Sequence, residues 1–136
     1  MKAIVIEEEN ETRDFLCEQL FELGVESVLE FNSGRKAVQY IENHNADRLT
    51  CIFLNINIKS FRASSFLDEL MLHSIYQDIP VFIITDNEVT IALLEDLNHE
   101  VCAYLTKPLT KKQIRECVSI SRRIERVNIL LETQAG

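Results

Sequence analysis

Five short apolar runs, separated by longer segments with a different periodicity, define the pattern of this chain. The runs lie at residues 3–6, 25–31, 51–54, 81–84 and 101–105. They are rich in β-branched and aromatic residues and are too short for helices. Runs of this kind are typical of strands that are buried on both faces of a parallel sheet.

Apolar residues that recur every three or four positions predict a helix after each strand. The first helix begins at Asn10, a suitable N-cap residue, and its pattern ends at Gly24. Further helices are predicted from Ser33 through Ile41, from 64 to 73 and from 88 to 97. Alternating strands and helices form βαβ units. We therefore predict a single domain over residues 1–136, an α/β fold with a doubly wound five-stranded parallel sheet between two helical layers.

The last helix is the longest one that the pattern predicts. Thr110 and Gln113 form a capping box, and the helix is expected from about 111 to 132. Its apolar residues follow a heptad-like spacing and form a seam: Cys117, Ile120, Ile124, Val127 and Leu131. The excess length favours a homodimer contact or a connector to another domain. The alternative is an amphipathic helix that lies on its own domain.

The composition narrows the class of partner. Hydrophobic residues make up 46% of the chain, charged residues 26%, and the formal net charge is -8. This charge argues against a nucleic-acid or membrane partner, and no apolar run is long enough to span a bilayer, so we expect a cytoplasmic protein. The charge is unevenly distributed: residues 107–136 hold seven basic and three acidic residues (+4), and residues 1–106 hold seven and nineteen (-12).

Cysteine and histidine spacing predicts neither a metal site nor a nucleophile. The four cysteines and three histidines are far apart, without a Cys-x-x-Cys pair. Cys51 and Cys102 lie within apolar runs and are expected to be small core residues.

Polar residues follow the carboxyl ends of the predicted strands, which is where open parallel sheets bind ligands and carry functional residues. These residues are Glu7, Glu8, Asn55, Thr85 and Lys107. An acidic run such as 7–9 can be a solvated turn. Facing a lysine from the loop after the last strand, however, paired carboxylates can also form a divalent-cation or anion-relay site.

Four motifs, in order and at matching intervals, resemble the receiver domain of bacterial response regulators from Met1 to about Arg123. Thr85 lies 30 residues and Lys107 lies 52 residues after Asn55, close to the family's spacing. The motifs are Ile4-Val5-Ile6-Glu7-Glu8-Glu9, Ile52-Phe53-Leu54-Asn55, Ile83-Ile84-Thr85 and Tyr104-Leu105-Thr106-Lys107-Pro108. The resemblance implies a flavodoxin-like, chemotaxis-regulator-like sheet with strand order 2-1-3-4-5.

The chain departs from the family at the residues that the resemblance assigns to phosphorylation. An Asp accepts the phosphoryl group in the family, whereas Asn55 stands here, and a neutral carboxamide cannot form an acyl phosphate. Glu7 and Glu8 replace shorter Asp residues, so Mg²⁺ binding is expected to be weak or absent, with no other cofactor. Asp86 replaces a small residue and would repel an incoming phosphate. Lys59, Arg62 and Ala63 replace the usual Pro, Asp and Gly of the next loop.

These departures predict a degenerate pocket without a catalytic residue. Its members are Glu7, Glu8, Asn55, Asn57, Thr85, Asp86 and Lys107. With no metal and no phosphate, Lys107 is expected to pair with Glu8 or Glu7 and close the pocket. Thr85 and Tyr104 occupy the family's switch positions. They are either a switch that a partner now shifts, or ordinary packing residues.

The leading interpretation is a phosphorylation-independent pseudo-receiver of two-component signalling. It would be a regulatory interaction module, not an enzyme, and would bind a protein partner through the face of the fourth helix, fifth strand and fifth helix. One alternative is a receiver that accepts phosphate on Asp86 or Thr85, or binds metal. Another is a small flavodoxin-like ligand binder, although Gly24, Gly34 and Gly136 are the only glycines and form no phosphate loop.

Overall fold

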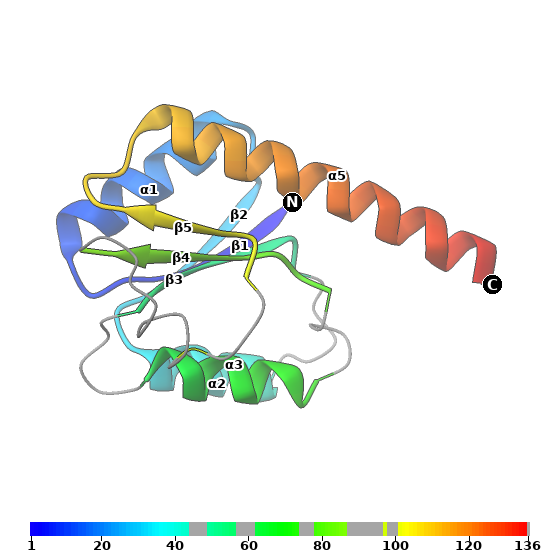
Figure 1. Cartoon of the computed structure of the whole chain (residues 1–136), viewed down its shortest axis with the longest axis horizontal. Coiled ribbons are helices and arrows are strands. Elements are labelled where there is room, and N and C mark those ends of the chain that lie inside the picture. Colours follow the sequence, from blue (N-terminus) through cyan, green and yellow to red (C-terminus); the bar gives the residue numbers. More distant parts are fainter. Residues whose placement is uncertain (44–48, 57–61, 74–77, 87–96, 98–100, 136) are drawn as a thin grey trace.

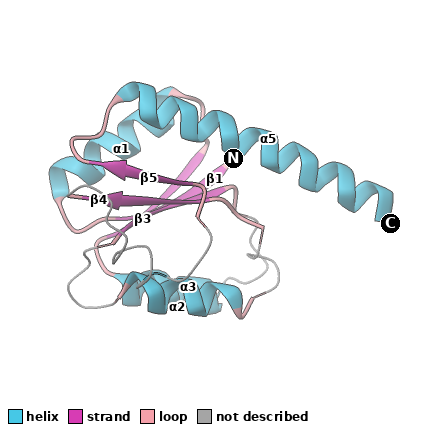
Figure 2. Cartoon of the chain, in the orientation of Figure 1, coloured by secondary structure: helices cyan, strands magenta, loops and turns pink. Residues whose placement is uncertain are grey.

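The computed structural model of the chain is built around a parallel sheet of five strands in the order β2-β1-β3-β4-β5 (Figures 1 and 2). The structure describes residues 1–43, 49–56, 62–73, 78–86, 97 and 101–135. The strands are β1 (Lys2–Ile6), β2 (Ser27–Phe31), β3 (Cys51–Asn55), β4 (Val81–Thr85) and β5 (Ala103–Thr106). This order confirms the predicted doubly wound, flavodoxin-like α/β fold.

Helices cover both faces of the sheet. On one side lie α1 (Asn10–Glu22) and α5 (Lys111–Ala135), and on the other lie α2 (Gly34–Asn43) and α3 (Ala63–Met71) (Figure 1). The helix that was predicted over 88–97 falls outside the described residues, apart from Leu97, which is buried in the core.

Burial on both faces explains why the central strands are apolar throughout. Every residue of β3 and β4 is buried. Successive side chains of a strand point to opposite faces, so Ile52 and Leu54 join the core under α2 and α3, whereas Phe53 joins the core under α1 and α5. The sequence pattern therefore reports the layered packing directly.

The sequence predicted the first residues of two helices, and one of these predictions is confirmed whereas the other is wrong. Thr110 and Gln113 form the predicted capping box, in which each backbone N–H donates to the other side chain, at 3.0 and 3.2 Å. Asn10 was predicted as an N-cap, but it is the first helical residue and Glu9 holds the cap position. The side chain of Asn10 is used elsewhere, because its oxygen accepts a hydrogen bond from Arg13 at 2.6 Å.

The long helix α5 extends to Ala135, beyond the predicted end near 132. Its first turns pack on the sheet through Ile114, Val118 and Ser121, and its second half projects past the sheet (Figure 1). Of the predicted seam, Cys117 is buried against the protein's own core, whereas Ile120, Val127 and Leu131 are exposed. The seam is therefore divided between the domain and solvent.

Of the two cysteines that were predicted in the core, one is buried there. Cys51 is fully buried, as expected, and Cys17 and Cys117 are buried as well. Cys102 was expected in the core but is exposed. It lies just before β5, and β5 is an edge strand of the sheet, so this part of the chain has a neighbouring strand on one side only. Within the described part of the chain, no helix has the length and apolar character of a bilayer span.

Truncating Phe53 should test the layered core. Phe53 is fully buried, and its ring stacks on that of Phe82 with centroids 5.2 Å apart. Phe53→Ala should lower the free energy of unfolding by about 3–5 kcal/mol because it leaves a cavity. The matched control is Phe21→Ala, at a residue that is 54% exposed, and it should cost less than about 1 kcal/mol. Urea denaturation measures both, and equal effects would contradict the assigned layers.

Candidate functional site

The carboxyl ends of four strands bring the candidate residues to one edge of the sheet. Glu7 follows β1, Asn55 ends β3, Thr85 ends β4 and Lys107 follows β5. The register keeps the ends level, since Ile6 pairs with Leu54 and Thr85 pairs with Thr106. Residues that are up to 100 positions apart in the sequence, such as Glu7 and Lys107, therefore meet.

Glu7 lies at the centre of the site. Its side chain is 1% exposed, and both of its oxygens accept hydrogen bonds from Nδ2 of Asn55, at 2.8 and 2.7 Å. The ammonium of Lys107 lies 2.7 Å from Oε1 of the same carboxylate. The buried charge is thus neutralised by one cation and solvated by one amide.

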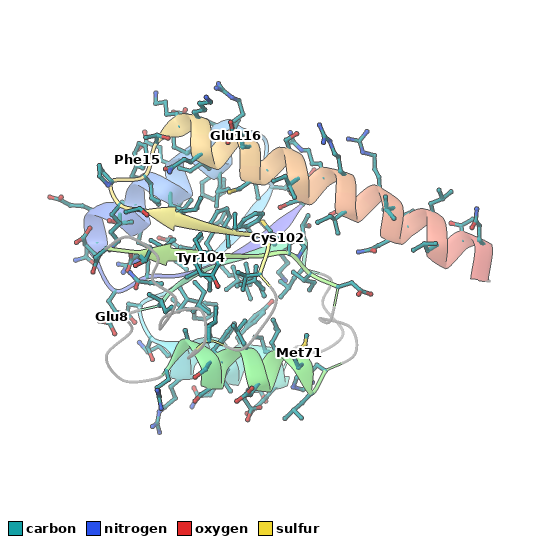
Figure 3. All side chains as sticks on the ribbon, viewed as in Figure 1. Glu8, Phe15, Met71, Cys102, Tyr104 and Glu116 are labelled. Carbon is teal, nitrogen blue, oxygen red and sulfur yellow. The ribbon has the colours of Figure 1, made fainter. Side chains whose placement is uncertain are left out.

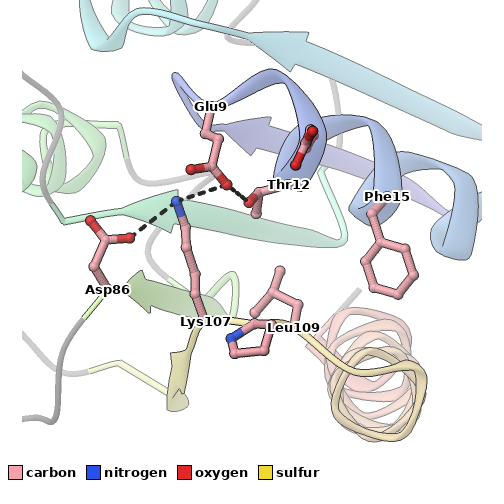
Figure 4. Close-up of a pocket in the computed structure, with 8 residues that line it drawn as sticks. Glu9, Thr12, Phe15, Asp86, Lys107 and Leu109 are labelled. Atoms are coloured by element: carbon pink, nitrogen blue, oxygen red, sulfur yellow. Dashed lines mark hydrogen bonds and ion pairs between the residues drawn. The ribbon is translucent and has the colours of Figure 1, made fainter.

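Lys107 links Glu7 to two carboxylates at the surface. Its Nζ lies 3.2 Å from Oδ1 of Asp86 and 3.7 Å from Oε1 of Glu9 (Figure 4). Burial alone would lower the pKa of Lys107, but the hydrogen bond and attraction to Glu7, and then those to Asp86, raise it above its ordinary value. The lysine therefore stays charged at neutral pH.

Arg13 holds the turn that carries the acidic residues. Its Nη1 donates to the backbone oxygen of Glu7 at 2.8 Å, and its Nη2 donates to the side chain of Asn10. Thr12 Oγ1 donates to the carboxylate of Glu9. Glu9, Thr12 and Arg13 were not predicted from the sequence as part of the site. The available signal was the spacing of an acidic N-cap residue and a hydroxyl three positions later.

The remaining predicted residues have mixed positions. Glu8 is half-buried, and the ion pairs of Lys107 go to Glu7, Glu9 and Asp86. Thr85 is buried. Tyr104 is half-buried and packs on the core beneath α2 and α3, where burial raises the pKa of its hydroxyl.

The loop after β3 is only partly described. Asn57 and Lys59 lie outside the described residues. Arg62 has an extended backbone and precedes α3, and Ala63 is the buried first residue of that helix.

The magnesium ion that the resemblance implies would meet a carboxylate that already has partners. Mg²⁺ needs anionic oxygens with available lone pairs in near-octahedral geometry. Both oxygens of Glu7 face N–H donors of Asn55, and Oε1 also faces the ammonium of Lys107. Among the described residues, no group of three or more His, Cys, Asp or Glu side chains is arranged to hold a metal ion.

A weak nucleophile stands at the end of β3, and three core cysteines hold protonated thiols. Asn55 is a neutral amide. Burial raises the pKa of Cys17, Cys51 and Cys117 to about 12, so these thiols stay protonated at neutral pH. The contacts described above for the side chains of the site are ion pairs and hydrogen bonds.

Comparisons with known proteins identify the class of this fold and site. The profile of the response regulator receiver domain matches residues 3–119. The chemotaxis protein CheY1 of Helicobacter pylori is 25% identical over 120 residues, which cover 88% of this chain and 95% of that protein.

Solved structures agree on the fold. Chemotaxis response regulator CheY4 of Vibrio cholerae matches with a TM-score of 0.74 and 16% identity, over 88% of this chain and 97% of that one. The receiver domain of a sensor histidine kinase from Pseudomonas aeruginosa matches with a TM-score of 0.71 and 19% identity, over 90% of this chain and 94% of that one. A magnesium ion is coordinated in the active-site cleft of that domain.

Replacing Lys107 tests how much the buried carboxylate of Glu7 destabilises the fold when its cation is absent. Lys107→Met keeps the aliphatic stem but leaves Glu7 without its cation, and it should lower the free energy of unfolding by about 3 kcal/mol or more. Glu7→Gln in the same chain should restore most of this loss, because the amide oxygen can still accept from Asn55. The matched control is Lys111→Met, at an exposed residue of α5, which should stay within about 0.5 kcal/mol of wild type in urea. Equal effects of the two single substitutions would contradict the role of Lys107.

The ion pair of Lys107 and Glu7 also predicts how the free energy of unfolding changes at alkaline pH. The pKa of Lys107 is raised in the folded state above its ordinary value of 10.5. Its stabilising contribution is therefore complete below pH 10.5 and is lost as the pH rises through the folded-state pKa. The difference in unfolding free energy between wild type and Lys107→Met should be constant from neutral pH to about pH 10 and then shrink. A difference that grows with pH would contradict the sign of this shift.

Proposed function

Because the chain belongs to the response regulator receiver domain family, we propose that it acts as a pseudo-receiver, a regulatory module of two-component signalling that works without phosphorylation. It would be a single receiver unit that performs no enzymatic reaction and binds no cofactor. The observation that carries the proposal is the contact of Asn55 and Lys107 with the buried carboxylate of Glu7.

The chemistry of this contact supports the absence of phosphoryl transfer. A carboxamide cannot attack a phosphoryl donor to form an acyl phosphate. The lysine that would meet the phosphoryl group is paired with Glu7 and Asp86. Asp86 also places a negative charge at the mouth of the site, where an incoming phosphate would be repelled.

The same contact supports weak or absent magnesium binding. The Pseudomonas aeruginosa receiver domain coordinates magnesium in its active-site cleft. Here the ammonium of Lys107 lies 2.7 Å from Glu7 and supplies a positive charge next to the carboxylate that a metal would need. Fixed protein charge would thus replace the ion.

A protein partner would use the face of β5, α5 and the helix predicted over 88–97. Tyr104 lies in β5 and Thr85 ends the neighbouring strand β4, and the partner would take the place of phosphate in shifting their positions. The net charge of -8 disfavours nucleic acid and anionic membranes, and a cytoplasmic location is part of this proposal.

The projecting half of α5 supports association between two copies of the chain. Val127, Leu130 and Leu131 are each more than half exposed, and apolar side chains in this number on one short segment favour a contact. A homodimer through this helix would cover them.

Treatment with acetyl phosphate and Mg²⁺, followed by intact-mass measurement, tests the proposal. The wild-type chain should gain no mass, because it has no acceptor. The positive control is the triple variant Glu7→Asp, Glu8→Asp, Asn55→Asp, which restores the acidic residues of the family and should gain about 80 Da, the mass of one phosphoryl group.

A wild-type adduct of this mass would overturn the proposal and favour the alternative acceptors. An acid-labile adduct that is absent in Asp86→Asn would identify Asp86. A stable adduct that is absent in Thr85→Val would identify Thr85.

A further inference from the structure

A cavity of about 560 Å³ opens beside Lys107, on the outer side of the carboxylate cluster. We call it the acidic pocket, and Figure 4 shows the residues that line it. They come from the start of α1, the end of β4 and the segment between β5 and α5: Glu9, Glu11, Thr12, Phe15, Asp86, Lys107, Pro108 and Leu109. Phe15, Pro108 and Leu109 give the pocket an apolar wall, and the carboxylates stand around it.

The charges of the acidic pocket favour a cationic occupant. Lys107 is the one cation in the lining, and its ammonium is already within 4 Å of Glu7, Glu9 and Asp86. Glu11 adds a further carboxylate, and the N-terminus of α1 contributes only about half a positive charge. An occupant that fits both parts of the pocket therefore carries apolar side chains next to arginine or lysine.

The projecting half of α5 has this chemistry. The helix is held to its own domain as far as Glu125, whose carboxylate accepts a hydrogen bond from Thr50 Oγ1 at 2.7 Å. Just before it, Arg122 Nη2 donates to the backbone oxygen of Leu23 at 2.5 Å. Beyond these contacts, Figure 3 shows side chains around the helix with no other described element beside them.

One face of this segment combines basic and apolar residues. Arg123, Arg126, Val127 and Leu130 are three, four and seven positions apart, so they lie on one side of an α-helix. All four are exposed, and they lie away from the buried positions Cys117, Val118 and Ser121. We call this group the basic face.

We propose that the basic face of α5 of a second copy of this chain docks in the acidic pocket. Val127 and Leu130 would pack on Phe15 and Leu109, and Arg123 and Arg126 would pair with Glu9, Glu11 and Asp86. This inference rests on the proposed association of copies through α5 and identifies the surface that receives the helix.

The position of the two surfaces sets the geometry of the contact. The acidic pocket lies at the carboxyl ends of the strands, whereas α5 projects beyond their amino ends (Figure 1). One chain therefore cannot fill its own pocket, and two different surfaces meet when copies join. In a linear oligomer formed by such head-to-tail contacts, the copy at one end has a free pocket and the copy at the other end has a free helix.

Two charge-reversal variants test the proposal by sedimentation at low salt. The pocket variant is Glu9→Lys, Glu11→Lys, and the helix variant is Arg123→Glu, Arg126→Glu. Wild type should form a concentration-dependent series of oligomers that added salt weakens. Each variant alone should associate at least about tenfold more weakly, because each lacks one half of the contact. The matched control is Asp14→Lys, Glu18→Lys, with the same change of charge at exposed residues of α1 outside the pocket, and it should behave as wild type.

Mixtures of variants distinguish this contact from a symmetric one. The pocket variant keeps an intact helix, and the helix variant keeps an intact pocket. We therefore expect one head-to-tail contact to form when the two variants are mixed at low salt, and sedimentation at the protein concentration used for wild type measures it. In that arrangement the intact helix of the pocket variant enters the intact pocket of the helix variant, and the reversed helix can pair with the reversed pocket. An equimolar mixture should therefore associate at least about tenfold more strongly than either variant alone.

The other outcomes overturn the inference in different ways. If the pocket variant self-associates as wild type does and the helix variant does not, copies pair through a symmetric helix seam, and the association stands without the pocket. If wild type stays monomeric at every concentration, the association itself is wrong. Circular dichroism and urea unfolding confirm that each variant is folded, and the intact-mass test of phosphorylation independence is unaffected by all of these outcomes.

Discussion

The carboxylate of Glu7 is buried at the edge where four strands end, and a charge in such a position is unstable without partners. Removing an ion of this kind from water costs several kcal/mol even after the protein relaxes. Nδ2 of Asn55 and Nζ of Lys107 lie within 2.8 Å of it and compensate this cost. The contact therefore ties β1 to β3 and to the segment that follows β5.

This contact also explains why Asn55 and Lys107 suit each other. With an aspartate at position 55, two carboxylates would share one buried lysine, and one of them would need another cation or a proton. The amide removes that requirement and supplies N–H donors to both oxygens of Glu7. The set of Glu7, Asn55 and Lys107 is thus neutral as a whole.

The sequence predicted those features that depend on local residues and on the layering of the sheet, and it missed contacts that depend on how separate elements pack together. The strand ends were predictable, because short apolar runs locate the strands and a parallel sheet aligns their carboxyl ends. Glu9, Thr12 and Arg13 were missed because their roles depend on how the first turn of α1 faces the site, which apolar spacing does not report. The capping box at Thr110 and Gln113 involves only local backbone, and it was predicted correctly.

The seam of α5 shows the limit of periodicity in another way. A three-and-four spacing identifies a face of a helix but not the surface that covers it. Cys117 packs on the protein's own sheet, whereas Val127 and Leu131 extend past the point where the sheet ends. Cys102 is a similar case, because an apolar run does not show that its first residues stand before an edge strand.

The separation of charge along the molecule has a consequence for how copies would meet. The body, residues 1–106, carries a formal -12, and residues 107–136 carry +4, so two copies that approach body to body repel each other. Approach of a projecting helix to the far end of another body lowers the electrostatic energy instead, which favours head-to-tail encounter over symmetric pairing of the bodies. The pairs formed would be near the surface and screened by salt, so each contact would be weak. Head-to-tail assemblies of this kind would lengthen as the local concentration rises, because each added copy presents a new pocket and a new helix.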